Sequence, residues 1–202
     1  MPDRAASRKK VVITIPLSKA PAFREDEQIS LRHLRTYLSR YDTVFVAPAS
    51  SRVTHPEIQT IRFPERFFGS VEAYNRLMLS REFYARFADY EFMLHYHLDA
   101  LVFSDQLLEW CNAGYDYIAP PWFRCEEAPW VDEPFIGNGG FSLRRIDAFL
   151  KVFDSRRLAV DPDRQWRDYC RVAPLWRRMI LWPRRYLRRH WRFNGVRQTI
   201  AT

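Results

Sequence analysis

The stretch Tyr90–Asp105 constrains the fold of this chain most strongly, because a mostly apolar run is interrupted by polar residues at one definite place. The run is typical of a strand that is buried on both faces of a sheet, and we expect it to extend over Tyr90–His97. His97 and Asp99 stand where this strand leaves the sheet. Ligands of open α/β sheets gather at the carboxyl ends of strands, so the sequence predicts a binding site here.

Short apolar runs alternate with helical patterns along most of the chain. The expected strands are 11–16, 43–48, 59–63, 90–97 and 116–123, and the expected helices are 25–38, 70–88, 106–113 and 146–153. Strands that alternate with helices form a mostly parallel sheet with helices on both faces. The sequence therefore predicts an α/β fold of the Rossmann type.

The composition is typical of a soluble globular protein. The chain has 202 residues, of which 47% are hydrophobic and 28% charged. No window approaches the roughly 18 consecutive apolar residues of a membrane span, and the start lacks the apolar region of a signal peptide, so we expect a cytoplasmic protein. The three cysteines lie far apart, which favours reduced thiols over a disulfide frame or a zinc site.

The charge is distributed unevenly. Residues 1–150 carry 18 Lys/Arg and 20 Asp/Glu, a net charge of −2, whereas residues 151–202 carry 14 and 4, a net charge of +10. Such asymmetry suggests an anionic partner for the C-terminal part, with a membrane surface favoured over nucleic acid because no nucleic-acid motif accompanies the arginines. The alternative is a plain solvated surface, since Arg outnumbers Lys by 28 to 4 throughout the chain. We expect a disordered start at 1–10, an α/β domain at 11–155 and a basic, Arg/Trp-rich helical extension at 156–202.

His97 and Asp99 are candidate ligands of a divalent cation. Side chains one residue apart point the same way on a strand, so the two can face one ion. The alternative is that Asp99 caps a turn and His97 is a hydrogen-bonded core residue, because two such residues alone are a weak metal signal.

The segment Gly137–Arg144 is a second candidate site. Its three glycines allow close approach of the backbone to a bulky ligand, and Asn138 offers a donor and an acceptor to sugar hydroxyls. Ser142 and Arg144 can reach phosphate oxygens. The alternative is a flexible hairpin, and the glycine spacing excludes a dinucleotide-binding fingerprint.

An aromatic loop lies between these two candidates. Trp122 and Trp130 have flat indoles that match the apolar faces of sugars, although ordinary core packing is the alternative and is favoured for Phe123. Residues 124–135 form a polar, acidic loop of a length that often carries function. No sequence motif marks a catalytic serine or cysteine nucleophile.

Four motifs in order give the chain a family resemblance. They are Tyr74–Ser80, Tyr96–Phe103, Tyr115–Trp122 and Gly137–Arg144. Together they resemble an uncharacterised glycosyltransferase-like family, a domain of unknown function grouped with GT-A nucleotide-diphosphosugar transferases. The resemblance covers about residues 11–155 and implies a GT-A fold, a nucleotide-diphosphosugar donor, and Mn²⁺ or Mg²⁺ at a D-x-D-like position.

The resemblance also suggests roles for individual residues. Asp99 takes the place of the cation ligand, with His97 assisting, and Pro16 lies beside the nucleotide. Asn138, Gly139, Gly140 and Arg144 shape the donor or acceptor site. Asp132 or Glu133 is the candidate general base, because an inverting transfer needs a carboxylate near the hydroxyl of a saccharide or lipid-linked acceptor.

Two departures from the family pattern support an alternative. Relatives usually carry Gln where His97 stands, and they continue past a segment like Phe193–Arg197 into an acidic motif that this sequence lacks. The alternative expectation is a truncated or catalytically impaired relative. Such a protein would bind sugar nucleotides, or dock through its Arg/Trp-rich extension on an anionic membrane at the inner face.

Overall fold

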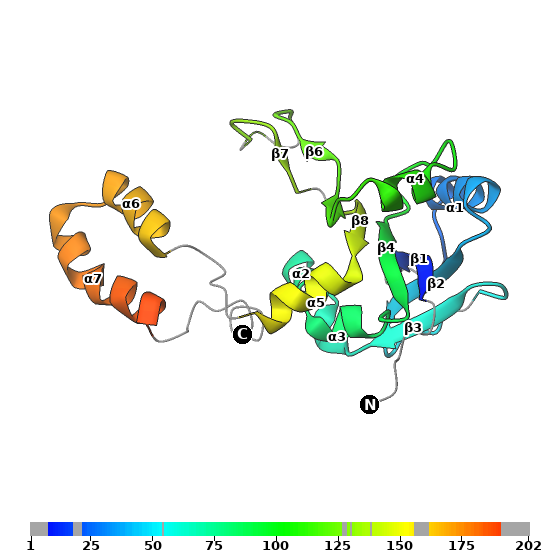
Figure 1. Cartoon of the computed structure of the whole chain (residues 1–202), viewed down its shortest axis with the longest axis horizontal. Helices are drawn as coiled ribbons and strands as arrows, with labels where there is room; N and C mark the ends of the chain where they lie inside the picture. Colours follow the sequence, from blue (N-terminus) through cyan, green and yellow to red (C-terminus); the bar gives the residue numbers. More distant parts are fainter. Residues whose placement is uncertain are drawn as a thin grey trace.

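The computed structural model describes residues 8–17, 22–53, 55–126, 129, 131–137, 139–155 and 162–190. Its centre is a six-stranded sheet with the order β3-β2-β1-β4-β8-β5 (Figure 1). The strands are β1 Lys9–Pro16, β2 Asp42–Pro48, β3 Gln59–Phe63, β4 Tyr90–Tyr96, β5 Tyr117–Ile118 and β8 Phe141–Arg145. Strands β1 to β4 are parallel, whereas β8 runs antiparallel to both β4 and β5. The predicted α/β fold with a mostly parallel sheet is confirmed.

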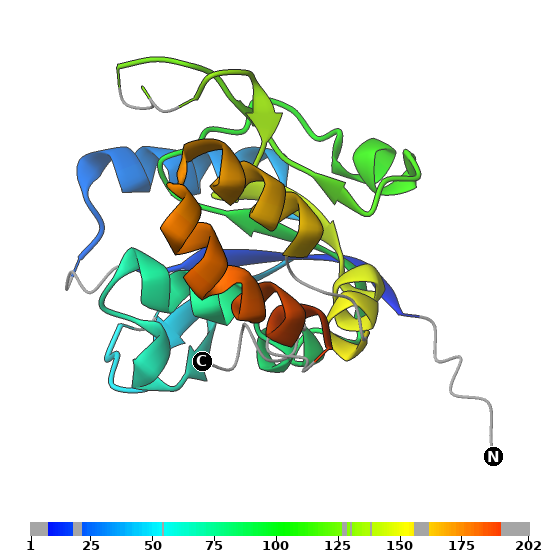
Figure 2. The ribbon, with the colours of Figure 1, turned by 90° about the vertical axis from the view of Figure 1, so that its left-hand side faces the viewer.

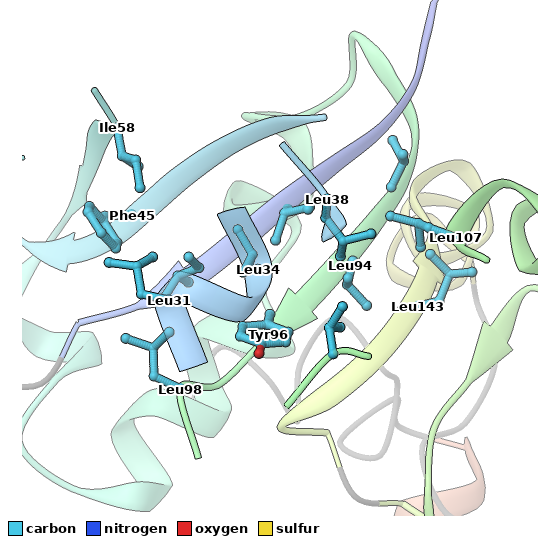
Figure 3. Close-up of a cluster of buried hydrophobic side chains, with 14 of the residues drawn as sticks. Leu31, Leu34, Leu38, Phe45, Ile58, Leu94, Tyr96, Leu98, Leu107 and Leu143 are labelled. Atoms are coloured by element: carbon cyan, nitrogen blue, oxygen red, sulfur yellow. The ribbon is translucent and has the colours of Figure 1, made fainter. Parts of the chain in front are cut away.

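The central strands are buried on both faces, which is why they consist of nearly continuous apolar runs. Alternate residues of β1 enter two different cores, Ile13 on one face and Val12 on the other. The first core lies under α1 Glu25–Tyr37 and α4 Leu107–Asn112, where Leu31 and Leu34 pack toward Leu94 (Figure 3). The second lies under α2 Val71–Met78, α3 Arg81–Ala85 and α5 Ile146–Asp154. A short 3₁₀ helix, Glu65–Phe67, precedes α2.

The structure departs from the expected elements at four places. The helix expected over 70–88 is broken, because the Ser80 side chain accepts a hydrogen bond from Phe83 N and starts a new helix, α3. The strand expected over 116–123 splits into β5 and β6 Pro121–Trp122, which pairs with β7 Phe135–Ile136. Strand β8 was not expected. Strand β1 begins at Lys9, inside the start expected to be disordered, and residues 1–7 lie outside the described residues.

Two helices follow the sheet domain. Helix α6 spans Pro162–Val172, α7 spans Leu175–His190, and the two contact each other (Figures 1 and 2). The guanidinium of Arg178 donates to the carbonyl of Ala173 at 2.7 Å, which ties the start of α7 to the end of α6. Within the described part of the chain, no helix is both long and apolar enough to cross a bilayer.

Candidate functional site

A cleft of about 580 Å³ lies at the carboxyl ends of β1 and β4. The strand order reverses between these two strands, since β2 and β3 lie on one side of β1 and β4 on the other. This is the position at which doubly wound sheets bind ligands. The lining residues are Pro16 and Leu17 after β1, His97, Leu98 and Asp99 after β4, Arg24 and Glu27 of α1, and Phe68, Gly69, Ser70, Val71, Tyr74 and Asn75 around the start of α2.

A tight turn places Asp99 at the rim of the cleft. Strand β4 ends at Tyr96, and the next residues turn, with Ala100 N donating to the carbonyl of His97 at 3.1 Å. The hydroxyl of the buried Tyr96 donates to the Ala100 carbonyl at 2.8 Å and fixes the turn to the core. The expectation that His97 and Asp99 point the same way along a strand is therefore wrong, because neither belongs to β4. Both nevertheless line the same cleft, with Asp99 exposed and His97 half-buried.

The glycine-rich segment lies directly beside this turn. His97 N donates to the carbonyl of Gly140 at 2.7 Å, so the residue before β8 meets the residue after β4. The Ser142 hydroxyl donates to the carbonyl of Gly139 at 3.0 Å and closes the turn that leads into β8. Gly140 is thus adjacent to the cleft residue His97, although neither Gly139 nor Gly140 lines the cleft, and Asn138 lies outside the described residues.

Arg144 is buried behind this segment and does not line the cleft. Its side chain donates to the Tyr84 hydroxyl at 2.8 Å, to Ser142 Oγ at 2.9 Å and to the carbonyl of Gly139 at 3.1 Å. The residue is only 5% exposed, and among the described residues no carboxylate forms an ion pair with it. The guanidinium expected to contact phosphate is therefore committed to neutral protein acceptors. Its positive charge still acts on the cleft, because interactions between charges weaken less in a buried setting than in water.

A chain of polar contacts leads from the sheet to the cleft through His95. His95 Nδ1 lies 3.1 Å from Thr14 Oγ1, and His95 Nε2 lies 3.1 Å from the Tyr74 hydroxyl and 3.2 Å from His97 Nε2. Thr14 and His95 are both buried in the sheet. Tyr74 and His97 are the members of the chain that line the cleft.

The contacts of His95 restrict the hydrogen-bonding roles of both histidines. Burial raises the pKa of Tyr74, so its phenol keeps its proton and can donate or accept at His95 Nε2. The single lone pair or single proton of His95 Nε2 is shared between Tyr74 and His97, and Thr14 takes the complementary role at Nδ1. His97 uses Nε2 for its contact with His95. Its Nδ1 has no hydrogen-bond partner among the described residues, and in the tautomer with the proton on Nε2 this nitrogen carries a lone pair.

Both histidines are held in the neutral form. Burial, assisted by the charges of Arg144 and His97, lowers the pKa of His95 well below its usual value. Burial also lowers the pKa of His97, an effect that Asp99 opposes and Arg144 reinforces. A neutral His97 can act as a ligand or a hydrogen-bond acceptor at its free nitrogen.

The start of α2 forms the opposite wall of the cleft. Ser70 is its N-cap and accepts a hydrogen bond from Ala73 N at 3.1 Å. The first turn carries partial positive charge, part of which the Glu72 carboxylate already takes up by accepting hydrogen bonds from its own backbone N–H and from Ser70. Arg24 is ion-paired with Glu27 at 3.6 Å, so these two cleft residues largely neutralise each other.

The predicted base candidates do not reach this cleft. Asp132 and Glu133 are exposed in the loop between β6 and β7, next to the buried Val131, and neither lines the cleft. Trp122 is half-buried in β6, whereas Phe123 is 58% exposed, so the expectation that Phe123 packs in the core is wrong. Phe123 directly follows β6, a two-residue strand that pairs with β7 and does not belong to the main sheet. Trp130 lies outside the described residues.

The described residues contain no cluster of three or more His, Cys, Asp or Glu side chains able to hold a metal ion. Asp99 and His97 Nδ1 are two potential ligands at one cleft. A divalent cation fits here only if a bound ligand supplies further oxygen atoms, as the phosphates of nucleotides do.

Sequence reasoning missed three members of the polar chain. Thr14 and His95 were read only as parts of strand runs, and Tyr74 only as part of an apolar helix stripe. The available signal was the pair of histidines at positions 95 and 97, together with a single polar residue inside the otherwise apolar 11–16 run.

Comparisons with known proteins identify the family. Neither the curated proteins nor the solved structures contain a match to this chain. A comparison with protein families matches residues 57–177 to the family described as "Protein of unknown function (DUF5672)". The matched region includes the turn at Asp99, strand β8 and helix α6, and it crosses the expected domain boundary at residue 155. Because the match covers more than half of the 202 residues, the chain belongs to the DUF5672 family.

Proposed function

We propose that this protein is a glycosyltransferase of GT-A type, which moves a sugar from a nucleotide diphosphate to an acceptor hydroxyl. The observation that carries the proposal is the position of Asp99, exposed at the rim of a cleft at the switch point between β1 and β4. A cleft of about 580 Å³ has the size of a small-ligand site. Pro16, at the end of β1, lines the same cleft and would lie beside the nucleotide.

Asp99 and His97 are the residues that would hold a divalent cation, Mn²⁺ or Mg²⁺. The Asp99 carboxylate is exposed, and His97 Nδ1, which has no hydrogen-bond partner among the described residues, would offer its lone pair in the tautomer protonated at Nε2. His95 would support His97 as the outer partner that fixes a ligand ring in place. The cation would supply charge neutralisation for the departing diphosphate.

The chain also offers positive potential of its own to the diphosphate. The first turn of α2 presents backbone N–H groups from one wall of the cleft. From the other side, the buried charge of Arg144 already influences His97 and therefore extends to the position where a phosphate would lie. Gly139 lets the Arg144 guanidinium approach closely, because a Cβ at this position would lie 3.1 Å from it, and Gly140 accepts a hydrogen bond from His97 N beside the cleft.

The acceptor, a saccharide or a lipid-linked sugar, would approach along the loop between β6 and β7. This loop carries Asp132 and Glu133, which are exposed and do not line the cleft, so either could act as the base only on an acceptor hydroxyl held at the loop itself. Trp122 at its base offers an aromatic surface to a sugar ring.

Binding without transfer is the second candidate function. It is favoured by the small number of carboxylates at the cleft, where only Glu27 and Asp99 are found among the described lining residues and Glu27 is ion-paired. An inverting transfer needs a free carboxylate as base. Measuring release of the free nucleoside diphosphate in the presence of acceptors separates the two functions.

Calorimetry with UDP- and GDP-sugars, with and without Mn²⁺, tests the proposal. We expect binding that depends on Mn²⁺ and weakens at least about tenfold in Asp99→Asn, the range for loss of an important metal-site interaction. Glu109→Gln, a change of an exposed carboxylate on α4, is the matched control and should bind as the wild type does. Equal affinity for the sugar nucleotide with and without Mn²⁺, or an Asp99→Asn variant that binds as the wild type does, would refute the cation site and with it the proposal.

A further inference from the structure

Helix α7 exposes a continuous apolar face. Seven apolar or aromatic side chains of this helix are solvent-exposed, from 38% for Leu187 to 79% for Met179. They are Leu175, Trp176, Met179, Ile180, Trp182, Tyr186 and Leu187. Monomeric soluble proteins rarely leave so many large apolar side chains together on one surface. This face therefore requires a partner.

The opposite side of the helix is mostly basic, with Leu181 as an apolar residue among the arginine positions. At 100° per residue, the exposed apolar positions fall within an arc of about 160°, and the six arginine positions fall on the opposite side. These are 177, 178, 184, 185, 188 and 189. The helix contains no Asp or Glu. Helix α7 thus has a wide apolar face with positive charge along both borders.

We propose that the apolar face of α7 docks in the interfacial region of an anionic lipid bilayer. Amphipathic helices with Trp and Leu on one face and arginines on the other lie in the membrane plane, with the apolar face among the lipid chains. The arginines then meet the anionic headgroups, each contributing about 1 kcal/mol near such a surface. The helix does not cross the bilayer, as its length and charge exclude a span.

The charge distribution favours lipid over other occupants of this face. A second copy of α7 would bring two arginine-rich borders together without any acidic residue of the helix to neutralise them. Nucleic acid would contact the arginines and leave Met179 and Ile180 exposed to water. An anionic bilayer covers the apolar face and neutralises the arginines at the same time.

The start of α7 is held in a defined position. The hydrogen bond from Arg178 to Ala173 joins it to α6, and the Arg177 guanidinium lies 5.1 Å from the ring centre of Trp176. A Trp ring with a guanidinium over its face is suited to the boundary between headgroups and lipid chains. This inference does not depend on the proposed sugar transfer.

Vesicle co-sedimentation with the full chain tests the inference. Vesicles of phosphatidylcholine alone are compared with vesicles that also contain phosphatidylglycerol, each at low and high salt. We expect salt-sensitive pelleting with the anionic vesicles only. The double variant Met179→Glu/Ile180→Glu should reduce the apparent affinity at least about tenfold, and Arg177→Gln about fivefold.

The control is Val152→Glu, which places one negative charge at an exposed apolar position of another helix, α5. It should pellet as the wild type does. Circular dichroism checks that the variants remain helical, and if the double variant unfolds, Arg177→Gln and the salt dependence still decide the question. Equal pelleting by wild type and Arg177→Gln, pelleting with neutral vesicles, or dimerisation through α7 without lipid would each overturn the inference.

Discussion

His97 Nε2 lies 3.2 Å from His95 Nε2, so a histidine buried in the sheet supports the histidine that lines the cleft. The contact joins the core to the candidate site. Changes at this contact should therefore affect both the stability of the fold and ligand binding at the cleft.

Removing the Tyr74 hydroxyl should destabilise the fold. Tyr74→Phe deletes one internal hydrogen bond to His95 Nε2, which costs about 1 kcal/mol in free energy of unfolding. Urea denaturation measures the change. Tyr115→Phe, a change at a tyrosine that is 60% exposed, is the control and should stay within about 0.5 kcal/mol of the wild type. A Tyr74→Phe variant as stable as the control would argue against a stabilising hydrogen bond between the phenol and His95.

Stability should fall as the pH drops below about 6.5. The folded-state pKa of His95 is well below the unfolded value of 6.5, so the unfolded chain binds a proton that the folded chain does not. The contribution of His95 is therefore complete above pH 6.5, and it declines by up to about 1.4 kcal/mol per pH unit below that value. The lowered pKa of His97 adds a loss in the same direction. Urea titrations between about pH 7.5 and pH 5 measure the slope, which should be shallower in His95→Gln; an identical slope in that variant would argue against this origin.

Replacing Arg144 should raise the pKa of His97. The charge of Arg144 disfavours protonation of the imidazole, so Arg144→Met removes one of the causes that lower its pKa, while burial remains. NMR titration of the His97 ring measures the shift. Arg86→Met, a change of an exposed arginine, should leave the titration unaltered. A His97 titration that is the same in both variants would mean that the field of Arg144 does not reach the cleft.

Two serine caps provide a matched pair. Ser70 caps α2 through Ala73 N at 3.1 Å, and Ser80 caps α3 through Phe83 N at 3.2 Å. Replacing either serine by Ala should cost about 1 kcal/mol of stability. Only Ser70 lines the cleft, so only Ser70→Ala should also weaken binding of sugar nucleotides. Equal binding by the two variants would remove the start of α2 from the candidate site.

The central strands could be predicted because their continuous apolar runs indicate burial on both faces of the sheet. Strands β1 and β2 are buried on both faces, and only a β-branched or aromatic run satisfies that environment. Strand β8 was missed for the opposite reason. It has five residues, includes two arginines and follows a glycine-rich turn, and its strand character comes from pairing with β4, which is nearly 50 residues earlier in the chain.

The candidate site was predictable in position and not in detail. The rule that ligands meet the carboxyl ends of strands located His97 and Asp99. The sequence could not show that Arg144 is buried, because burial of a cation depends on acceptors such as Tyr84 that come from a distant helix. For the same reason the contacts of His95 were not visible in the sequence.

The reversed direction of β8 has a consequence for how this protein can diversify. A parallel strand brings the segment that follows it to the ligand edge, whereas β8 brings the segment that precedes it. The hairpin of β6 and β7, which comes between β5 and β8 in the chain, is therefore presented at that edge, and β5 and β8 themselves pair in the sheet. Evolution can lengthen or replace this hairpin and so change which ligand the protein recognises, while the two hydrophobic cores of the sheet stay the same.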